Sequence, residues 1–181
     1  MGAKLMNINN ILLVEDDPRD VELTLAALEE HHLANNVAVV DNGAEALDYL
    51  YCRGKFKTRL GGNPVVVLLD LKMPKVTGLE VLKIIKVDEQ LKTMPVVMLT
   101  SSRETPDLIE CYKHGVNAYV VKPVDFGEFV NAVKQVGVFW AAVNEPPPHS
   151  GREETLVQNG KVISPGNKEA ENEIPAPNPA S

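Results

Sequence analysis

The chain has 181 residues, 44% of them hydrophobic, which suits one globular domain with a substantial core. Its 18 basic and 25 acidic residues give a net charge of −7, and this acidic balance argues against binding to nucleic acid, which is contacted mainly through Lys and Arg. The two cysteines exclude a disulfide framework, and no apolar run is long enough for a signal peptide or a transmembrane helix, so we expect a cytoplasmic protein without membrane contacts.

Composition divides the chain into an N-terminal extension (1–9), one domain (10–145) and a proline-rich tail (146–181). The tail has too few large apolar residues to offset the entropy of ordering it, so we expect it to lack fixed structure. Residues 155–164, with Asn159-Gly160 at the centre, have the pattern of a β-hairpin with a type I′ turn. A lone two-stranded hairpin is marginal in water, so we expect this one only if it docks on the domain.

Within the domain, short apolar runs alternate with helical patterns. The runs that predict strands are 11–14, 37–40, 65–69, 96–99 and 118–121. Unbroken runs of β-branched and aliphatic residues are typical of strands buried on both faces, as in a parallel sheet covered by helices.

Five helices are expected between and after these strands, over about 18–28, 44–51, 78–85, 106–114 and 125–143. Asp17 is expected to cap the first helix, with Pro18 at its first position, and Gly115 to end the fourth. The residues expected to face the core are Val21, Leu25, Leu28, Ala46, Leu47, Leu50, Val81, Leu82, Ile85, Phe129, Val133, Val136 and Trp140. Five strand–helix units in succession predict an α/β fold with a doubly wound, five-stranded parallel sheet and right-handed crossovers.

Chemically active side chains follow four of the five expected strands. They are Glu15, Asp16 and Asp17 after the first, Asp70 after the third, Thr100 after the fourth, and Lys122 after the fifth. Ligands of open parallel sheets bind beyond the carboxyl ends of the strands, so this edge is the expected site.

Clustered carboxylates repel one another and need a cation, and Mg²⁺ with oxygen ligands is the usual choice beside a phosphate. Asp16 is placed to hold the metal directly and Glu15 to act through water. Asp70 has the position of a carboxylate nucleophile that forms an acyl phosphate, while Lys122 meets a phosphate oxygen and Thr100 donates a hydrogen bond. Helix capping is the preferred explanation of Asp17 and of Asp125, whereas capping at Asp16 and Asp70 would leave Lys122 and Thr100 unexplained.

Four segments in order, 11–18 (ILLVEDDP), 68–78 (LLDLKMPKVTG), 96–102 (VVMLTSS) and 118–123 (AYVVKP), resemble the receiver domains of two-component systems. The resemblance spans nearly all of residues 10–143 and implies a flavodoxin-like sheet with strand order 2-1-3-4-5. It also implies that Asp70 accepts phosphate from a sensor histidine kinase, and that the backbone carbonyl of Lys72 completes the metal site. Thr100 and Tyr119 match the switch hydroxyl and switch aromatic of the family, and the bond between Lys122 and Pro123 is usually cis.

A finer resemblance, over 18–23, 47–50, 53–63, 121–126 and 140–148, is to the small regulators paired with phytochrome-type histidine kinases. It implies a bacteriophytochrome as the partner kinase and a homodimer formed through the last helices and the final strand. Phe139 and Trp140 would supply an apolar patch for that contact. The alternative for Trp140 is that it only packs the last helix onto the sheet.

Two other functions stay open beside the phosphorylation switch. A phosphatase with a phosphoaspartyl intermediate commonly needs a second aspartate two residues after the nucleophile, and position 72 is Lys, so we do not expect an enzyme. An interaction module that has lost phosphorylation would not need the complete set of Asp16, Asp70, Thr100 and Lys122. We also expect Lys72 to alter the lifetime of the phosphoryl group. No output domain is visible after Glu145, so we expect output through protein contacts or phosphate relay.

Overall fold

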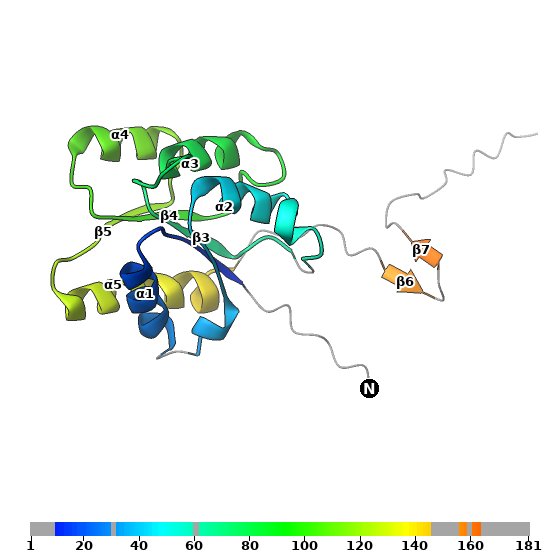
Figure 1. The fold of residues 1–181 in the computed structure, drawn as a ribbon, viewed down its shortest axis with the longest axis horizontal. Helices are drawn as coiled ribbons and strands as arrows, with labels where there is room; N and C mark the ends of the chain where they lie inside the picture. Colours follow the sequence, from blue (N-terminus) through cyan, green and yellow to red (C-terminus); the bar gives the residue numbers. More distant parts are fainter. Residues whose placement is uncertain (1–9, 30–31, 60–61, 146–155, 159–160, 164–181) are drawn as a thin grey trace, which may run out of the picture.

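In the computed structural model, residues 10–29, 32–59, 62–145, 156–158 and 161–163 are described. One parallel sheet forms the centre of the domain, in the order β2-β1-β3-β4-β5 (Figure 1). Its strands are β1 (Ile11–Val14), β2 (Val37–Val40), β3 (Val66–Leu69), β4 (Val96–Thr100) and β5 (Ala118–Val121). This order confirms the doubly wound, flavodoxin-like α/β fold expected from the sequence.

The burial of the strands follows their place in the sheet. Every residue of the three central strands β1, β3 and β4 is buried, which explains their unbroken apolar runs, because helices cover both faces of the sheet. The edge strands β2 and β5 are mostly half-buried. Val14 lies in register with Val40 and Leu69, and Thr100 with Val121, so the carboxyl ends of neighbouring strands reach the same edge.

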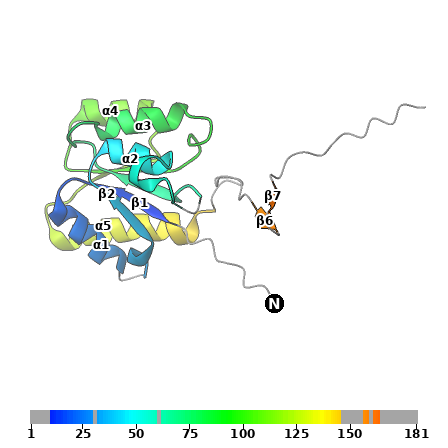
Figure 2. The same cartoon turned by 45° about the vertical axis from the view of Figure 1, so that its right-hand side comes forward.

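Five α-helices cover the sheet in two layers. They are α1 (Pro18–Glu29), α2 (Gly43–Leu50), α3 (Gly78–Val87), α4 (Thr105–Lys113) and α5 (Phe126–Val138), and α5 continues as a π-helical turn, η3 (Phe139–Val143). Two 3₁₀ turns, η1 (Ala34–Asn36) and η2 (Gly54–Phe56), precede β2 and β3. Helices α2, α3 and α4 lie on one face of the sheet and α1 and α5 on the other, which Figures 1 and 2 show from two directions. Among the described residues, no helix has the length and apolar content that crossing a membrane requires.

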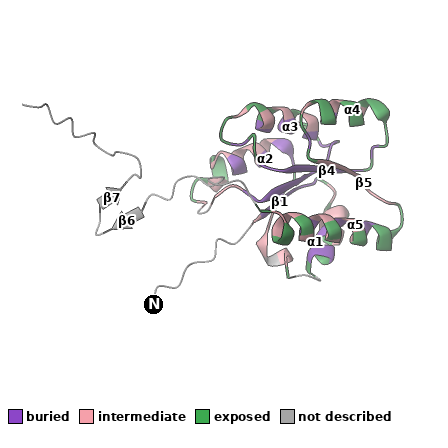
Figure 3. Cartoon of the chain, turned by 180° about the vertical axis from the view of Figure 1, so that it is seen from behind, coloured by how far each residue is buried: buried purple, intermediate pink, exposed green. Residues whose placement is uncertain are grey.

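Each face of the sheet has its own hydrophobic core, and the buried residues lie where the helices meet the strands (Figure 3). The expected inward residues of α3, namely Val81, Leu82 and Ile85, are all fully buried. The expectation for α1 is partly wrong, because Thr24 and Ala27 are buried beside Leu28 while Val21 and Leu25 are only half-buried. The physical reason is that α1 packs against α5 as well as against the sheet, so the buried face of α1 is the one directed toward both.

Side-chain caps fix where helices α1, α2, α3 and α5 begin, and the cap of α2 is Asn42. The Oδ1 of Asp17 accepts a hydrogen bond from the Arg19 N–H at the start of α1, and the Oδ1 of Asp125 accepts one from the Glu128 N–H at the start of α5. Both aspartates therefore have the capping role that the sequence predicts. Thr77 and Glu80 form a reciprocal capping box at the start of α3, which places this helix directly after the loop that follows β3.

One expectation needs correction. No peptide bond in the described part of the chain is cis, so the bond between Lys122 and Pro123 is trans, the more stable isomer for most such bonds. In the tail, β6 (Leu156–Gln158) pairs antiparallel with β7 (Lys161–Ile163), at the residues where the sequence has the pattern of a β-hairpin. The extension 1–9 and the rest of the tail lie outside the described residues.

Candidate functional site

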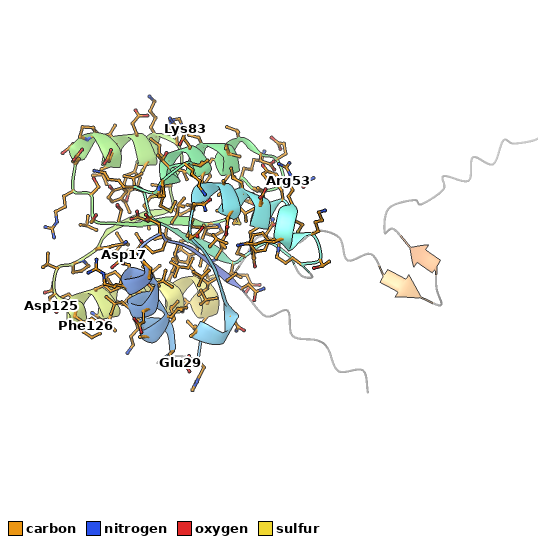
Figure 4. All side chains as sticks on the ribbon, in the orientation of Figure 1. Asp17, Glu29, Arg53, Lys83, Asp125 and Phe126 are labelled. Atoms are coloured by element: carbon orange, nitrogen blue, oxygen red, sulfur yellow. The ribbon has the colours of Figure 1, made fainter. Side chains whose placement is uncertain are left out.

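The carboxyl edge of the sheet gathers the side chains that the sequence analysis selected there. One carboxylate oxygen from each of Glu15, Asp16 and Asp70 lies within 4.8 Å of the others, although these residues follow two different strands. Asp17 and Asp125 lie at this same edge, whereas Arg53 lies at the opposite one (Figure 4). The parallel register of the strands therefore produces a compact acidic site.

Asp70 is the buried acid at the end of β3, with only 6% of its surface exposed. Its Oδ2 accepts a hydrogen bond of 3.0 Å from the backbone N–H of Lys72, and its Oδ1 lies 3.5 Å from the Nζ of Lys122. A Cβ atom at Gly78 would collide with the backbone oxygen of Asp70. Only glycine therefore lets α3 begin so close to Asp70. Gly78 belongs to the sequence motif, but the sequence analysis gave no reason for a glycine there.

Burial raises the pKa values of Asp70 and Glu15 above their ordinary values, because both carboxylates lose hydration in the site. The charge of Lys122 and hydrogen bonds from Lys72 and Thr100 act in the opposite direction on Asp70, and contacts with Lys122 do so on Glu15. The charge of Asp70 raises the pKa of Glu15 further. Holding these acids ionised side by side costs free energy, and a bound cation would relieve that cost.

Lys122 is the cation that the chain itself supplies. Its Nζ lies 2.6 Å from the Oε2 of Glu15 and 2.6 Å from the Oδ2 of Asp20, and its side chain is 10% exposed. Burial alone would lower the pKa of Lys122, but the bonds to Asp20 and Glu15 and the charge of Asp70 raise it above its ordinary value. The sequence analysis did not select Asp20. The only signal for it was its position in the first turn of α1, shortly after the acidic residues that follow β1.

Thr100 and Tyr119 are connected through one loop. Thr100 is fully buried at the end of β4, and its Oγ1 accepts a hydrogen bond of 3.2 Å from the Ser102 N–H. The hydroxyl of Tyr119 donates to the Ser102 carbonyl at 3.2 Å, and the Ser102 hydroxyl donates to Asp107 in α4 at 2.6 Å. The loop after β4 therefore joins the buried hydroxyl to the start of α4, and the sequence analysis did not select Ser102.

Lys72 extends away from Asp70 toward α4. Its Nζ lies 3.5 Å from the Oε1 of Glu104 and 3.8 Å from the Oδ2 of Asp107, so the side chain spans from the loop after β3 to the start of α4. The backbone N–H of Lys72 contacts Asp70, whereas the role of its carbonyl as a metal ligand stays a prediction.

Phe139 and Trp140 lie in η3, apart from the acidic site. Trp140 packs against the core beneath α1 and α5, while Phe139 is 48% exposed, and their rings meet edge to face at 5.0 Å. Phe139, Val138 and Val143 line a shallow apolar groove of about 330 Å³. Packing therefore accounts for Trp140, and the exposed apolar surface belongs mainly to Phe139 and Val143.

The donor set at the acidic site fits a hard divalent cation. All three candidate side chains offer carboxylate oxygens, which Mg²⁺ and Mn²⁺ prefer, and they include no thiol or imidazole. Asp16 is exposed and so accessible to a hydrated ion, whereas Glu15 and Asp70 are buried behind it.

We expect the substitution Asp70→Asn to stabilise the protein at pH 7 in the absence of divalent metal, by on the order of 1 kcal/mol. Because the pKa of Asp70 is raised, the native state binds this proton more tightly than the unfolded state and loses stability as pH rises through and above the ordinary value of an aspartate. The advantage of Asp70→Asn, measured by urea unfolding with chelator, should therefore grow from pH 4 to pH 7. Asp125→Asn, which keeps an N-cap, is the control, and an advantage independent of pH would contradict this reading.

Comparison with known proteins connects this geometry to a family. Residues 11–134 match the family described as the response regulator receiver domain. Response regulator Rcp1 of Synechocystis sp. is 34% identical over 130 residues, 72% of this chain and 87% of Rcp1. The structure of the Mn²⁺-bound form of Rcp1 has a TM-score of 0.71 at 32% identity and covers 77% of this chain and 99% of that one.

Two further solved structures are similar to this chain. The bacteriophytochrome response regulator RtBRR is 59% identical, with a TM-score of 0.63, over 79% of this chain and 86% of its own. The phosphorylated cyanobacterial phytochrome response regulator RcpA is 35% identical, with a TM-score of 0.72, over 77% and 99%. The sheet order, the acidic site and these matches agree: the chain belongs to the response regulator receiver domain family and is related to the phytochrome response regulators.

Proposed function

We propose that Asp70 accepts a phosphoryl group from a sensor histidine kinase and that the protein acts as a signalling switch or relay. One observation carries the proposal: the buried Asp70 lies within 4.8 Å of two further carboxylates and 3.5 Å from Lys122. Asp16 and Asp70, with the Lys72 carbonyl and Glu15 through water, would hold Mg²⁺. When bound, this ion would neutralise charge on the phosphoryl oxygens.

The chain's own residues have distinct roles in the transfer. A carboxylate oxygen of Asp70 attacks the phosphorus of the kinase phosphohistidine, a P–O bond forms, and the P–N bond breaks with its electron pair left on the imidazole. Lys122 balances charge on the incoming phosphoryl oxygens, and the Thr100 hydroxyl donates a hydrogen bond to one of them. Thr100 can respond in this way because its hydroxyl is held next to the site by the loop after β4.

The signal would leave the site through the loop that joins Thr100 to α4. The Oγ1 of Thr100, which now accepts a hydrogen bond from the Ser102 N–H, would donate a new one to the phosphoryl group. Ser102 is also hydrogen-bonded to Tyr119 and Asp107. A shift of this loop would therefore move α4 and the Tyr119 ring together. Leu108, Ile109 and Tyr112 expose apolar surface on α4, which suits a partner protein.

The kinase is proposed to be of the phytochrome type. Support comes from the similarity to two phytochrome response regulators, one of them 59% identical to this chain. The cytoplasmic location and the lack of nucleic-acid and membrane contacts stay predictions from the sequence.

Incubation with acetyl phosphate and Mg²⁺ tests the acceptor role. We expect an adduct of one phosphoryl group by intact mass, labile at alkaline pH, that is lost in Asp70→Asn and with chelator. Asp125→Asn, which removes an acid at the same edge of the sheet, should label as the wild type does.

The same experiment separates the other functions. Steady turnover of acetyl phosphate without an accumulating adduct would favour a phosphatase. Absence of any adduct, under conditions in which a known receiver domain is labelled, would favour an interaction module and contradict the proposal.

Lys72 is expected to prolong the phosphorylated state, because its side chain spans the approach between the loop after β3 and α4 and limits the entry of water. Lys72→Ala should therefore lose phosphate about two- to fivefold faster, measured as adduct decay after removal of acetyl phosphate. Lys83→Ala, in the groove between α3 and the end of α4, is the charge-matched control. Decay of Lys72→Ala at the wild-type rate would refute this role.

The protein is also proposed to form a homodimer in which a second copy covers the groove beside Phe139. The π-helical turn places Phe139 and Val143 outward on one surface, beside Asn131, Lys134, Gln135 and Val138 of α5. Phe139→Asp should weaken association at least tenfold in sedimentation equilibrium, because it would bury a charge. Val124→Asp, at a more exposed apolar residue outside the groove, should not, and a wild-type monomer at high concentration would contradict the proposal.

A further inference from the structure

Asp20 is the third residue of α1, yet its side chain contacts a residue 102 positions later in the chain. Its Oδ2 accepts a hydrogen bond of 2.6 Å from the Nζ of Lys122. An acid in the first turn of a helix ordinarily interacts with the free N–H groups there. Here Pro18 has no N–H, and the N–H groups of Arg19 and Asp20 both bond Asp17, so the side chain of Asp20 is not needed for that purpose.

The Lys122 ammonium has three N–H donors and three acidic neighbours. The contacts to Glu15 and Asp20 are both 2.6 Å, whereas the oxygen of Asp70 lies 3.5 Å away. The positive charge of Lys122, which would balance the negative charge of a phosphoryl group on Asp70, is therefore already shared with two other carboxylates.

The two short contacts differ in how easily they can be exchanged for water. The side chain of Glu15 is 4% exposed, so a carboxylate released there would stay buried and unpaired. The side chain of Asp20 is 31% exposed, so water can replace Lys122 as its partner. Asp20 is thus the neighbour from which Lys122 is released at lower cost.

We propose that Asp20 is a positioning residue that holds Lys122 in the unphosphorylated site and competes with the phosphoryl group for its charge. This inference rests on the proposed acceptor role of Asp70. Asp20 would then set how strongly the site retains phosphate, without contacting the phosphate itself.

The test compares Asp20→Asn with Asp17→Asn in the full chain. Both variants remove one negative charge from the start of α1, and Asn at position 17 keeps an N-cap, but only Asp20 contacts Lys122. The first measurement, without metal, follows the ¹⁵N signal of the Lys122 ammonium. We expect this signal to move in Asp20→Asn and to stay in place in Asp17→Asn.

The second measurement is the affinity for fluoroberyllate, a phosphoryl mimic, in the presence of Mg²⁺. We expect affinity to rise about three- to tenfold in Asp20→Asn, less than twofold in Asp17→Asn, and to return to the wild-type value in Asp20→Glu. If Asp20 had a purely structural role, Asp20→Asn would lower the affinity instead of raising it.

An unmoved Lys122 signal, or equal affinities of Asp20→Asn and Asp17→Asn, would overturn the inference while leaving the acceptor role intact. Failure of the wild type to bind fluoroberyllate at all would instead overturn the acceptor role and, with it, the competition.

Discussion

The arrangement of the site depends on the repulsion among carboxylates that the parallel sheet forces together. Glu15 and Asp70 lie buried beside each other because β1 and β3 are neighbours in register and both end at the same edge. Burial raises the pKa values of both acids, because their charged forms lose hydration and become less stable. A cation is therefore needed: the chain itself supplies Lys122 from the end of β5, and the exposed Asp16 would admit a divalent ion.

This constraint connects stability to signalling. Burying an acceptor carboxylate among like charges lowers the free energy of unfolding of a receiver domain. Binding of a metal ion and a phosphoryl group would add favourable contacts at the same site. The buried Thr100 and the half-buried Tyr119 are both hydrogen-bonded to Ser102, and Ser102 is hydrogen-bonded to α4. A change of charge at Asp70 has a short route of contacts to an exposed helix face, whereas the Phe139 groove lies on a separate part of the surface.

The sequence was sufficient for the fold and for most of the site, since unbroken apolar runs predict central parallel strands and the residues after them must share one edge. Asp16, Asp70 and Lys122 could be grouped for that reason. Asp20 could not, because its contact depends on how far the first turn of α1 lies from the end of β5, which no local pattern encodes. Thr24 in place of Leu25 on the buried face of α1 likewise depends on the packing of α5. The direction of Lys72 depends on two acids at the start of α4.

The central claim is that Asp70, Asp16, Lys122 and Thr100 act as one phosphoryl-accepting site. A crystal structure of the full chain with Mg²⁺ and fluoroberyllate tests it most directly. The account predicts beryllium bonded to a carboxylate oxygen of Asp70, fluorides in contact with Lys122 and Thr100, and Mg²⁺ on Asp16 and Asp70. Fluoroberyllate on another carboxylate, or on Asp70 without contacts from Lys122 and Thr100, would contradict it.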